Sequence, residues 1–194
     1  MGKRVVVIAS GETERMALPH LLRHLESDNV GILGPILTPP RQHALTPDSA
    51  CKLVQAAWYW NDPQPDKFVI LVDADGKDPQ MVVATFAQRL EGTKCQDIPV
   101  PIKVVAAKWH LEAWFWADPH ALRSYVGRDL GNVDINDPDA IPSPKQCLKD
   151  LLDVPYTARV AGEIAQGIST TEVGKRSRSF AHFEQAIRNG SAPT

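Results

Sequence analysis

The chain has 194 residues, of which 43% are hydrophobic and 23% charged, and its formal net charge at pH 7 is −2. This length and composition predict a globular domain with a sizeable core. The near-neutral charge provides no overall attraction to nucleic acid or to an anionic membrane, so such binding would need a local basic patch. No apolar run approaches the roughly 18 residues that a membrane-spanning helix requires.

The cysteines and the N-terminus favour a cytoplasmic protein. Cys51, Cys95 and Cys147 are an odd number and include no C-x-x-C pair, which argues against a disulfide framework and against a zinc-cysteine site. The apolar part of the opening residues MGKRVVVIAS is too short for a secretory signal and is typical of a strand.

The first elements alternate between strand and helix. Residues 4–9, RVVVIA, are continuously apolar and β-branched, which is typical of a strand buried on both faces. From Gly11, leucines and Met16 recur at helical spacing as far as the polar residues 26–29. The next segment, GPILTPP at 34–40, predicts a short strand broken by its prolines, near an edge of the sheet.

The middle of the chain repeats this alternation. Asp48 or Ser49 would cap the next helix, and Gly92 would close the one after it. The predicted elements are a helix at 48–60, a strand at 67–75, a helix at 81–92, and a strand at 101–109 leading into the segment 110–127. Repeated β-α units predict an α/β fold with a mainly parallel sheet flanked by helices.

The last third of the chain is predicted to be helical. A polar, turn-rich loop at 128–144 precedes the three helices, and the tail NGSAPT is expected to fray. The predicted helices lie near 144–152, 157–168 and 178–189. We therefore expect an α/β core over residues 1–127 and a loop and helical portion over 128–194 that packs on this core, within one domain overall.

Acidic residues follow the three strong strands. Glu12 and Glu14 come after the first, Asp73 and Asp75 after the second, and Glu112 after the third. Ligands of open α/β sheets bind outside the carboxyl ends of the strands, and if Asp73 and Asp75 both stay extended they share a face. Clustered carboxylates favour Mg²⁺ or Mn²⁺. The alternative is that these acids are only helix-dipole and turn residues.

The order of these motifs resembles the Toprim domain of topoisomerases, primases and nucleases of the overcoming-lysogenization-defect (OLD) type. The resemblance is closer to a small bacterial family of Toprim-like proteins of unknown function, often encoded beside an ATPase. It covers nearly the whole chain and is carried by Ser10-Gly11-Glu12-Thr13-Glu14, Leu18-Pro19, Asp73-Ala74-Asp75, Glu112-Ala113-Trp114-Phe115, Lys145 and Ser179-Phe180.

This resemblance implies a divalent-metal-dependent nuclease or phosphodiesterase acting on nucleic acid. Glu14, Asp73 and Asp75 match the acids that would hold Mg²⁺ or Mn²⁺, and Glu112 would support them or add a ligand. Lys145 would face a phosphate. The resemblance also implies a separate ATPase subunit as partner and a role in genome maintenance or anti-phage defence. The sequence leaves open whether the chain forms a homo-oligomer.

Ser10 departs from the family pattern, because it stands where the first glutamate of E-G-x-x-E is expected. A serine hydroxyl is a weak Mg²⁺ ligand and a poor base near neutral pH. Glu12 lies two residues away and would substitute in part as a metal ligand. The alternative function is therefore a catalytically impaired Toprim-like subunit for binding or assembly.

Other residues allow both a functional and a structural interpretation. Lys175, Arg176 and Arg178 form a short basic run that would bind phosphate or would simply be a solvated face; Arg41 is a weaker phosphate candidate. His20 and His24 have the spacing of zinc ligands on a helix but lack a third ligand. The aromatic residues Trp109, Trp114, Phe115 and Trp116 would stack bases or, more commonly, form core.

Overall fold

The computed structural model describes residues 2–40, 43–131 and 135–189. These residues form a four-stranded sheet with the strand order β2-β1-β3-β4, and every neighbouring pair is parallel. The strands are β1 (Lys3–Ile8), β2 (Val30–Ile32), β3 (Lys67–Asp73) and β4 (Ile102–Ala107). The predicted α/β fold, with a parallel sheet and a helical C-terminal part, is confirmed. Arg41 and the last residues of the tail lie outside the described ranges.

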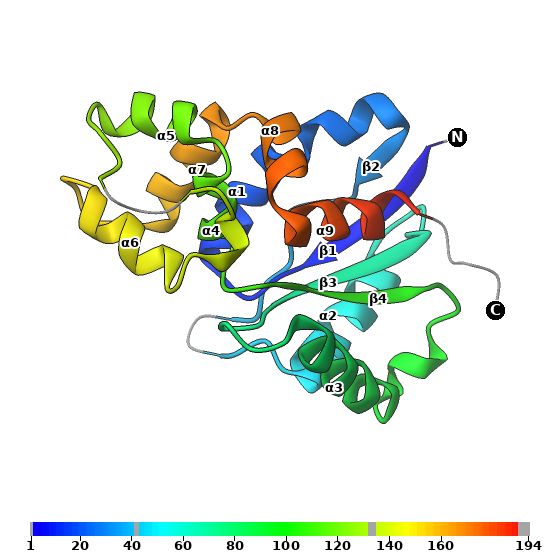
Figure 1. Ribbon diagram of the computed structural model, residues 1–194. Helices are drawn as coiled ribbons and strands as arrows, with labels where there is room; N and C mark the ends of the chain where they lie inside the picture. The colour runs from blue at the N-terminus through cyan, green and yellow to red at the C-terminus, as the bar shows by residue number, and fades with distance from the viewer. Residues whose placement is uncertain (1, 41–42, 132–134, 190–194) are drawn as a thin grey trace.

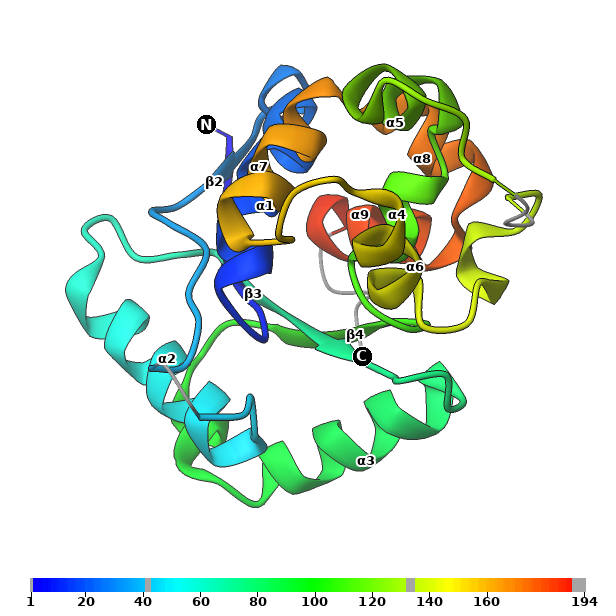
Figure 2. The same cartoon turned by 90° about the vertical axis from the view of Figure 1, so that its left-hand side faces the viewer.

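The register of the central strands aligns their carboxyl ends. Ile8 of β1 pairs with Ile70 of β3, and Asp73 of β3 pairs with Ala107 of β4. In a parallel sheet the segments that follow the strands therefore begin at one common edge. Figure 2 faces these ends and shows α4 (Glu112–Trp116) and α6 (Pro144–Leu151) side by side above the sheet.

Helices cover both faces of the sheet. Helices α2 (Pro47–Trp60) and α3 (Pro79–Glu91) cover one face, while α1 (Glu12–Leu22), α4 and α9 (Arg178–Arg188) lie over the other (Figure 1). Alternate side chains of the strands enter two separate cores: Val5 and Val7 belong to one, Val6 and Ile8 to the other. This alternation explains why β1 is continuously apolar in sequence.

Two sequence predictions in the first half of the chain are wrong. The edge strand is Val30–Ile32 rather than 34–40, where a single bridge joins Leu37 to Ile8. The chain turns directly into β2 through Asn29, which has a left-handed φ of 58°. The cap of α2 is Thr46, which exchanges hydrogen bonds with Ser49 in a capping box; Pro47 takes the first helical position, as proline prefers.

The C-terminal helices are more numerous than predicted. The structure has α7 (Ala158–Gly167) and an additional α8 (Thr170–Arg176) before α9, and α5 (Pro119–Val126) is separate from α4 because Asp118 caps it. Three short 3₁₀ segments complete the described elements: Arg23–Asp28, Lys94–Asp97 and Pro138–Ala140. Helix α7 packs on α1, and α9 packs on β4. The division of the chain at residue 127 stays a prediction.

A helix must be long and apolar to cross a bilayer. Within residues 2–40, 43–131 and 135–189, none is long and apolar enough to cross it.

Candidate functional site

An acid cluster lies at the carboxyl ends of β1, β3 and β4. Glu14 is in the first turn of α1, directly after β1; Asp73 is the last residue of β3; Glu112 is the first residue of α4, after β4. The charges of Glu14 and Glu112 both raise the pKa of Asp73, so the three carboxyls are electrostatically coupled. The structure thus brings together one acid from each of the three predicted strand ends.

Ser10 bridges two of these acids. Its hydroxyl donates a hydrogen bond of 3.1 Å to Oδ2 of Asp73 and also interacts with the carboxyl of Glu14, whose pKa it lowers. A hydroxyl has only one proton to donate, so the two carboxyls share it. Ser10 therefore lies inside the cluster, where it lowers the charge repulsion instead of adding a fourth carboxylate.

Burial and neighbouring negative charges raise the pKa of both Glu14 and Asp73. Glu14 is 6% exposed, and its burial raises its pKa, with a further rise from the charge of Glu112. Burial, followed by the charge of Glu14, raises the pKa of Asp73 to about 8. The raised pKa of Asp73 favours its protonated form near neutral pH, unless a cation replaces the proton.

Glu112 is the most deeply buried acid of the cluster. It is fully buried, and its Oε1 accepts a hydrogen bond of 2.9 Å from the hydroxyl of Tyr156. The ammonium of Lys145 lies 3.3 Å from the same oxygen and 5.9 Å from the centre of the Tyr156 ring. Burial and then the charge of Glu112 raise the pKa of Tyr156, so the phenol stays a donor. The Oε2 atom of Glu112 is buried and has no hydrogen-bond partner among the described residues.

Asp75 does not extend β3 as the sequence analysis expects. Its φ is 50°, so the chain turns immediately after Asp73 and the two acids do not alternate along a strand. Its carboxylate lies 3.0 Å from Nε2 of His110, and its side chain is 63% exposed. Its charge is the weakest of the influences that raise the pKa of Asp73. Asp75 therefore lies at the rim of the acid cluster.

Glu12, the other acid of the opening motif, forms an ion pair with Arg15 one turn along α1, at 2.5 Å. It is not among the charges that perturb Glu14 or Asp73. A role for Glu12 as a metal ligand stays a prediction.

The basic run near the C-terminus has structural partners. Arg176 donates hydrogen bonds to the main-chain carbonyls of Ala117 and Ile135, and Lys175 forms an ion pair with Glu172 at 2.8 Å. Arg178 is exposed at the start of α9. Of the predicted phosphate-binding cations, only Lys145 contacts the acid cluster within the described part of the chain.

The histidines and aromatic residues mostly have structural roles. His24 pairs with Glu184 of α9. Trp114, Phe115 and Trp116 are completely buried, which confirms the prediction that they form core. Trp114 stacks on Phe183 and meets Phe180 edge to face.

Sequence reasoning missed two contributors to the site. Tyr156 comes from the segment between α6 and α7, 44 residues from its partner Glu112, and no local pattern marks it. The pairing of His110 with Asp75 carries a weak signal, since His110 directly follows the third predicted strand.

The donor chemistry of the cluster fits a hard divalent cation. Its members are carboxylates, and a buried carboxylate oxygen of Glu112 lacks a partner in the described structure. No group of three or more His, Cys, Asp or Glu side chains within residues 2–40, 43–131 and 135–189 is arranged to hold a metal ion. Mg²⁺ is commonly bound through one or two carboxylates together with water and substrate phosphates, so Glu14 and Asp73 are the acids that could hold it.

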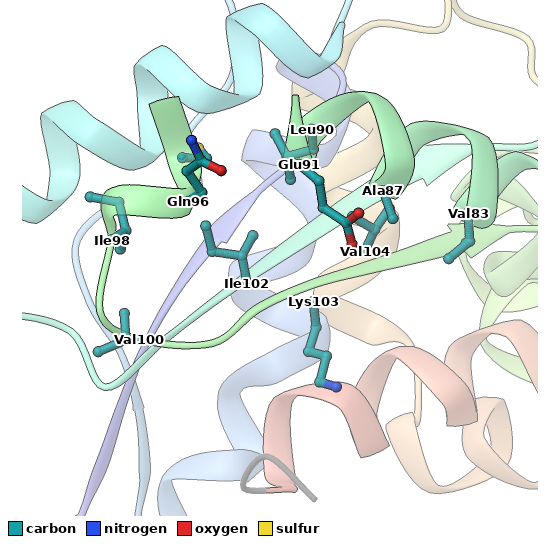
Figure 3. A pocket seen from close by; sticks show the side chains of 11 residues that line it. Val83, Ala87, Leu90, Glu91, Gln96, Ile98, Val100, Ile102, Lys103 and Val104 are labelled. Carbon is teal, nitrogen blue, oxygen red and sulfur yellow. The ribbon is translucent and has the colours of Figure 1, made fainter. Parts of the chain in front are cut away.

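Two hollows lie beside α3. One, of about 510 Å³, runs between α3 and the edge strand β4 (Figure 3). Ile102 and Val104 point into it, whereas Lys103 points to the other face of the sheet. Its lining is mostly aliphatic and includes none of the clustered acids, so it is not the site of the acid chemistry. The second hollow runs along another side of α3, from Lys77 to Arg89.

A sequence profile of the family described as "Domain of unknown function (DUF4276)" matches residues 10–188. The chain belongs to the DUF4276 family. The match begins at Ser10 and includes Lys145 and Tyr156, so the whole acid cluster lies within the region that defines the family. No curated protein matches this DUF4276 chain.

Three solved structures of the C-terminal region of the Xanthomonas campestris pv. campestris OLD protein are similar to this DUF4276 chain. The one phased with iodine has 15% identity and a TM-score of 0.45, and covers 95% of this chain and 96% of that one. The one phased with mercury has 16% identity and a TM-score of 0.45, with coverages of 95% and 93%. The one phased with platinum has 16% identity and a TM-score of 0.47, with coverages of 95% and 90%.

Proposed function

We propose that this DUF4276 protein is a phosphodiesterase that acts on nucleic acid and depends on Mg²⁺ or Mn²⁺. The observation that carries the proposal is the placement of Glu14 and Asp73 at the adjoining carboxyl ends of β1 and β3, where burial and the charge of Glu14 raise the pKa of Asp73. A divalent cation offsets this repulsion better than a single proton does.

Glu14 and Asp73 would hold the cation, with Asp75 at the rim of the site. A bound divalent cation supplies Lewis acidity toward a phosphoryl oxygen and lowers the pKa of a coordinated water. Ser10 fixes the orientation of Asp73 through its hydrogen bond to Oδ2. These residues lie at the carboxyl ends of parallel strands, where α/β proteins bind their ligands.

Lys145 is the cation placed to meet the phosphate. Its ammonium is held at Oε1 of Glu112, and its side chain is 40% exposed, so it can neutralise a charge that approaches from solvent. Glu112 thereby acts as a positioning residue, and Tyr156 positions Glu112 in turn through its hydroxyl.

The direct test is cleavage of supercoiled and single-stranded DNA with Mn²⁺ or Mg²⁺ by the wild type, Asp73→Ala and Ser10→Glu. We expect cleavage by the wild type and a loss of at least about a hundredfold in Asp73→Ala, because groups that act as a unit lose most activity together. The proposal fails if the wild type cleaves neither substrate with either metal, or if Asp73→Ala cleaves as the wild type does.

Ser10 favours a second candidate function, a binding or assembly subunit with impaired catalysis. Its hydroxyl lies where the resembling motif has a carboxylate, and it donates to Asp73 instead of accepting a proton. An inactive wild type together with an active Ser10→Glu variant would support this candidate and exclude the first. The ATPase partner and the defence role rest only on the sequence resemblance.

Replacing Tyr156 with phenylalanine is expected to lower the activity about tenfold without unfolding the protein, because supports of metal-site residues are commonly worth about 10–100-fold. The matched control is Tyr125→Phe, which removes a hydroxyl that also donates to a glutamate at 2.9 Å, but to Glu163 at the surface. Cleavage rates of both variants provide the measurement. Equal rates would show that Tyr156 does not position Glu112.

A further inference from the structure

The second hollow beside α3 opens at the same end of the sheet as the acid cluster. It has a volume of about 640 Å³ and runs along α3 from Lys77, just before the helix, to Arg89 in its last turn, with Pro47, the first residue of α2, beside it. We call it the Met81 groove; its other main lining residues are Lys77, Val82, Phe86 and Arg89. Since α3 follows β3 directly, the groove begins where the chain leaves Asp73 and Asp75.

The floor of the Met81 groove is apolar and open to solvent. Met81 is 68% exposed, and Val82 and Phe86 are half-buried beside it. A large apolar side chain that folding leaves exposed inside a concave surface is typical of a binding site. A thioether adapts well to a flat, polarisable ring.

The rim of the groove carries two available cations. Lys77 and Arg89 are exposed, and in the described part of the chain no ion pair or side-chain hydrogen bond engages either of them. The rim has one acid, Asp78, which caps α3 by accepting a hydrogen bond from the main-chain N–H of Gln80. The groove therefore combines an apolar floor with a net positive rim, which is complementary to a base and its flanking phosphates.

The loop between the acids and the groove is held in place. Gly76 has a φ of +78°, and a Cβ added there would overlap the ring of Trp109. Nζ of Lys108 donates to the carbonyl oxygens of Gly76 and Lys77, at 3.1 and 2.9 Å. The backbone of Lys77 is thus fixed before any ligand is bound, so binding a phosphate would cost little conformational entropy in this loop.

The groove and the acids are close enough to contact one strand. One residue, Gly76, separates Asp75 from Lys77, so their Cα atoms are at most about 7 Å apart. Stacked nucleotides advance about 3.4 Å each along a strand, so the groove begins about two nucleotides from the acid cluster.

We propose that the Met81 groove binds an unpaired base of a single-stranded nucleic acid, with Lys77 and Arg89 on the adjacent phosphates. The path of the strand rests on the proposed function, since the acids would act on a phosphate about two nucleotides from this base. A paired base cannot lay its face on the groove floor, so the groove selects single strands over duplexes.

The test is fluorescence polarisation with a labelled DNA strand of about 20 nucleotides, longer than the roughly 4–16 that one site covers, in EDTA. We expect Met81→Asp to weaken binding at least about tenfold, because an acid replaces the apolar floor. Lys77→Ala and Arg89→Ala should each lower the slope of log K against log salt by about 0.7. An aspartate in the first turn of α3 is favoured by the helix dipole, so the variant should fold.

Matched controls lie away from the carboxyl ends of the strands. Trp60→Asp places an acid at an 85% exposed site at the end of α2, and Lys94→Ala removes an exposed lysine beyond α3. Both should bind as the wild type does. Wild-type affinity in Met81→Asp, equal affinity of the wild type for duplex, or no binding by the wild type would each overturn the groove proposal.

EDTA removes the divalent metal, so binding is measured without cleavage. Each of the two proposals can therefore be contradicted without the other. A wild type that binds the strand through Met81 but never cleaves with Mn²⁺ contradicts only the proposed activity. A wild type that cleaves, combined with unchanged binding by Met81→Asp, contradicts only the groove.

Discussion

Replacing Asp73 with asparagine is expected to abolish cleavage and at the same time to stabilise the fold. The amide cannot carry the negative charge that a divalent cation needs, so we expect the rate to fall at least about a hundredfold. Its oxygen still accepts the hydrogen bond that Ser10 gives to Asp73. The buried repulsion with Glu14, however, disappears.

The gain in stability should depend on pH. Burial and the charge of Glu14 raise the pKa of Asp73 in the folded state from 3.8 to about 8. A raised folded-state pKa contributes stability that is fully present below the unfolded value and is lost as the pH rises through the folded value. The wild type therefore loses this contribution between pH 3.8 and about 8, whereas Asp73→Asn does not.

Thermal unfolding of both proteins across this pH range, without divalent metal, measures the effect. At the alkaline end we expect Asp73→Asn to melt several degrees above the wild type, since each kcal/mol corresponds to about 2–4 °C for a chain of this size. At the acidic end the melting temperatures should converge. A difference in melting temperature that does not vary with pH would mean that the pKa of Asp73 is not raised in the folded protein.

Replacing Trp114 with alanine is expected to produce the largest loss of stability of any single change. Trp114 is completely buried between Phe180 and Phe183 of α9, and its indole N–H donates to Ser179 at 2.8 Å. Cavities of this kind cost about 3–5 kcal/mol. Because α4 also carries Glu112, activity should fall together with stability.

Urea unfolding of Trp114→Ala checks this expectation, with Trp60→Ala as the matched control. Trp60 is 85% exposed, so its removal should change the free energy of unfolding by less than about 0.5 kcal/mol. A loss below about 1 kcal/mol in Trp114→Ala would show that α4 is not anchored through this ring.

The convergence of the acids could be predicted because parallel strands end at one edge of a sheet. The runs before Gly11 and Asp73 are apolar on both faces, which is the pattern of central parallel strands. The run before Trp109 forms the edge strand β4, in which Lys103 is exposed. Knowing those three strands was enough to place Glu14, Asp73 and Glu112 together. The core role of Trp114 was likewise predictable from its apolar surroundings.

The remaining features depend on contacts that no local pattern encodes. Tyr156 reaches Glu112 from a segment far along the chain. Arg176 donates its hydrogen bonds to two main-chain carbonyls that come close to it only in the folded chain. The left-handed turn at Asp75 is allowed for aspartate but not required by it. Strand β2 is only three residues long, too short for a hydrophobic period.

Calorimetric titration of Mn²⁺ into the protein near neutral pH, in two buffers of different ionisation enthalpy, tests the central claim most directly. If Glu14 and Asp73 share a proton that the cation replaces, the wild type should release about one proton for each Mn²⁺ bound. Asp73→Asn should show neither this binding nor the release. Absence of Mn²⁺ binding by the wild type, or binding without proton release, would contradict the account.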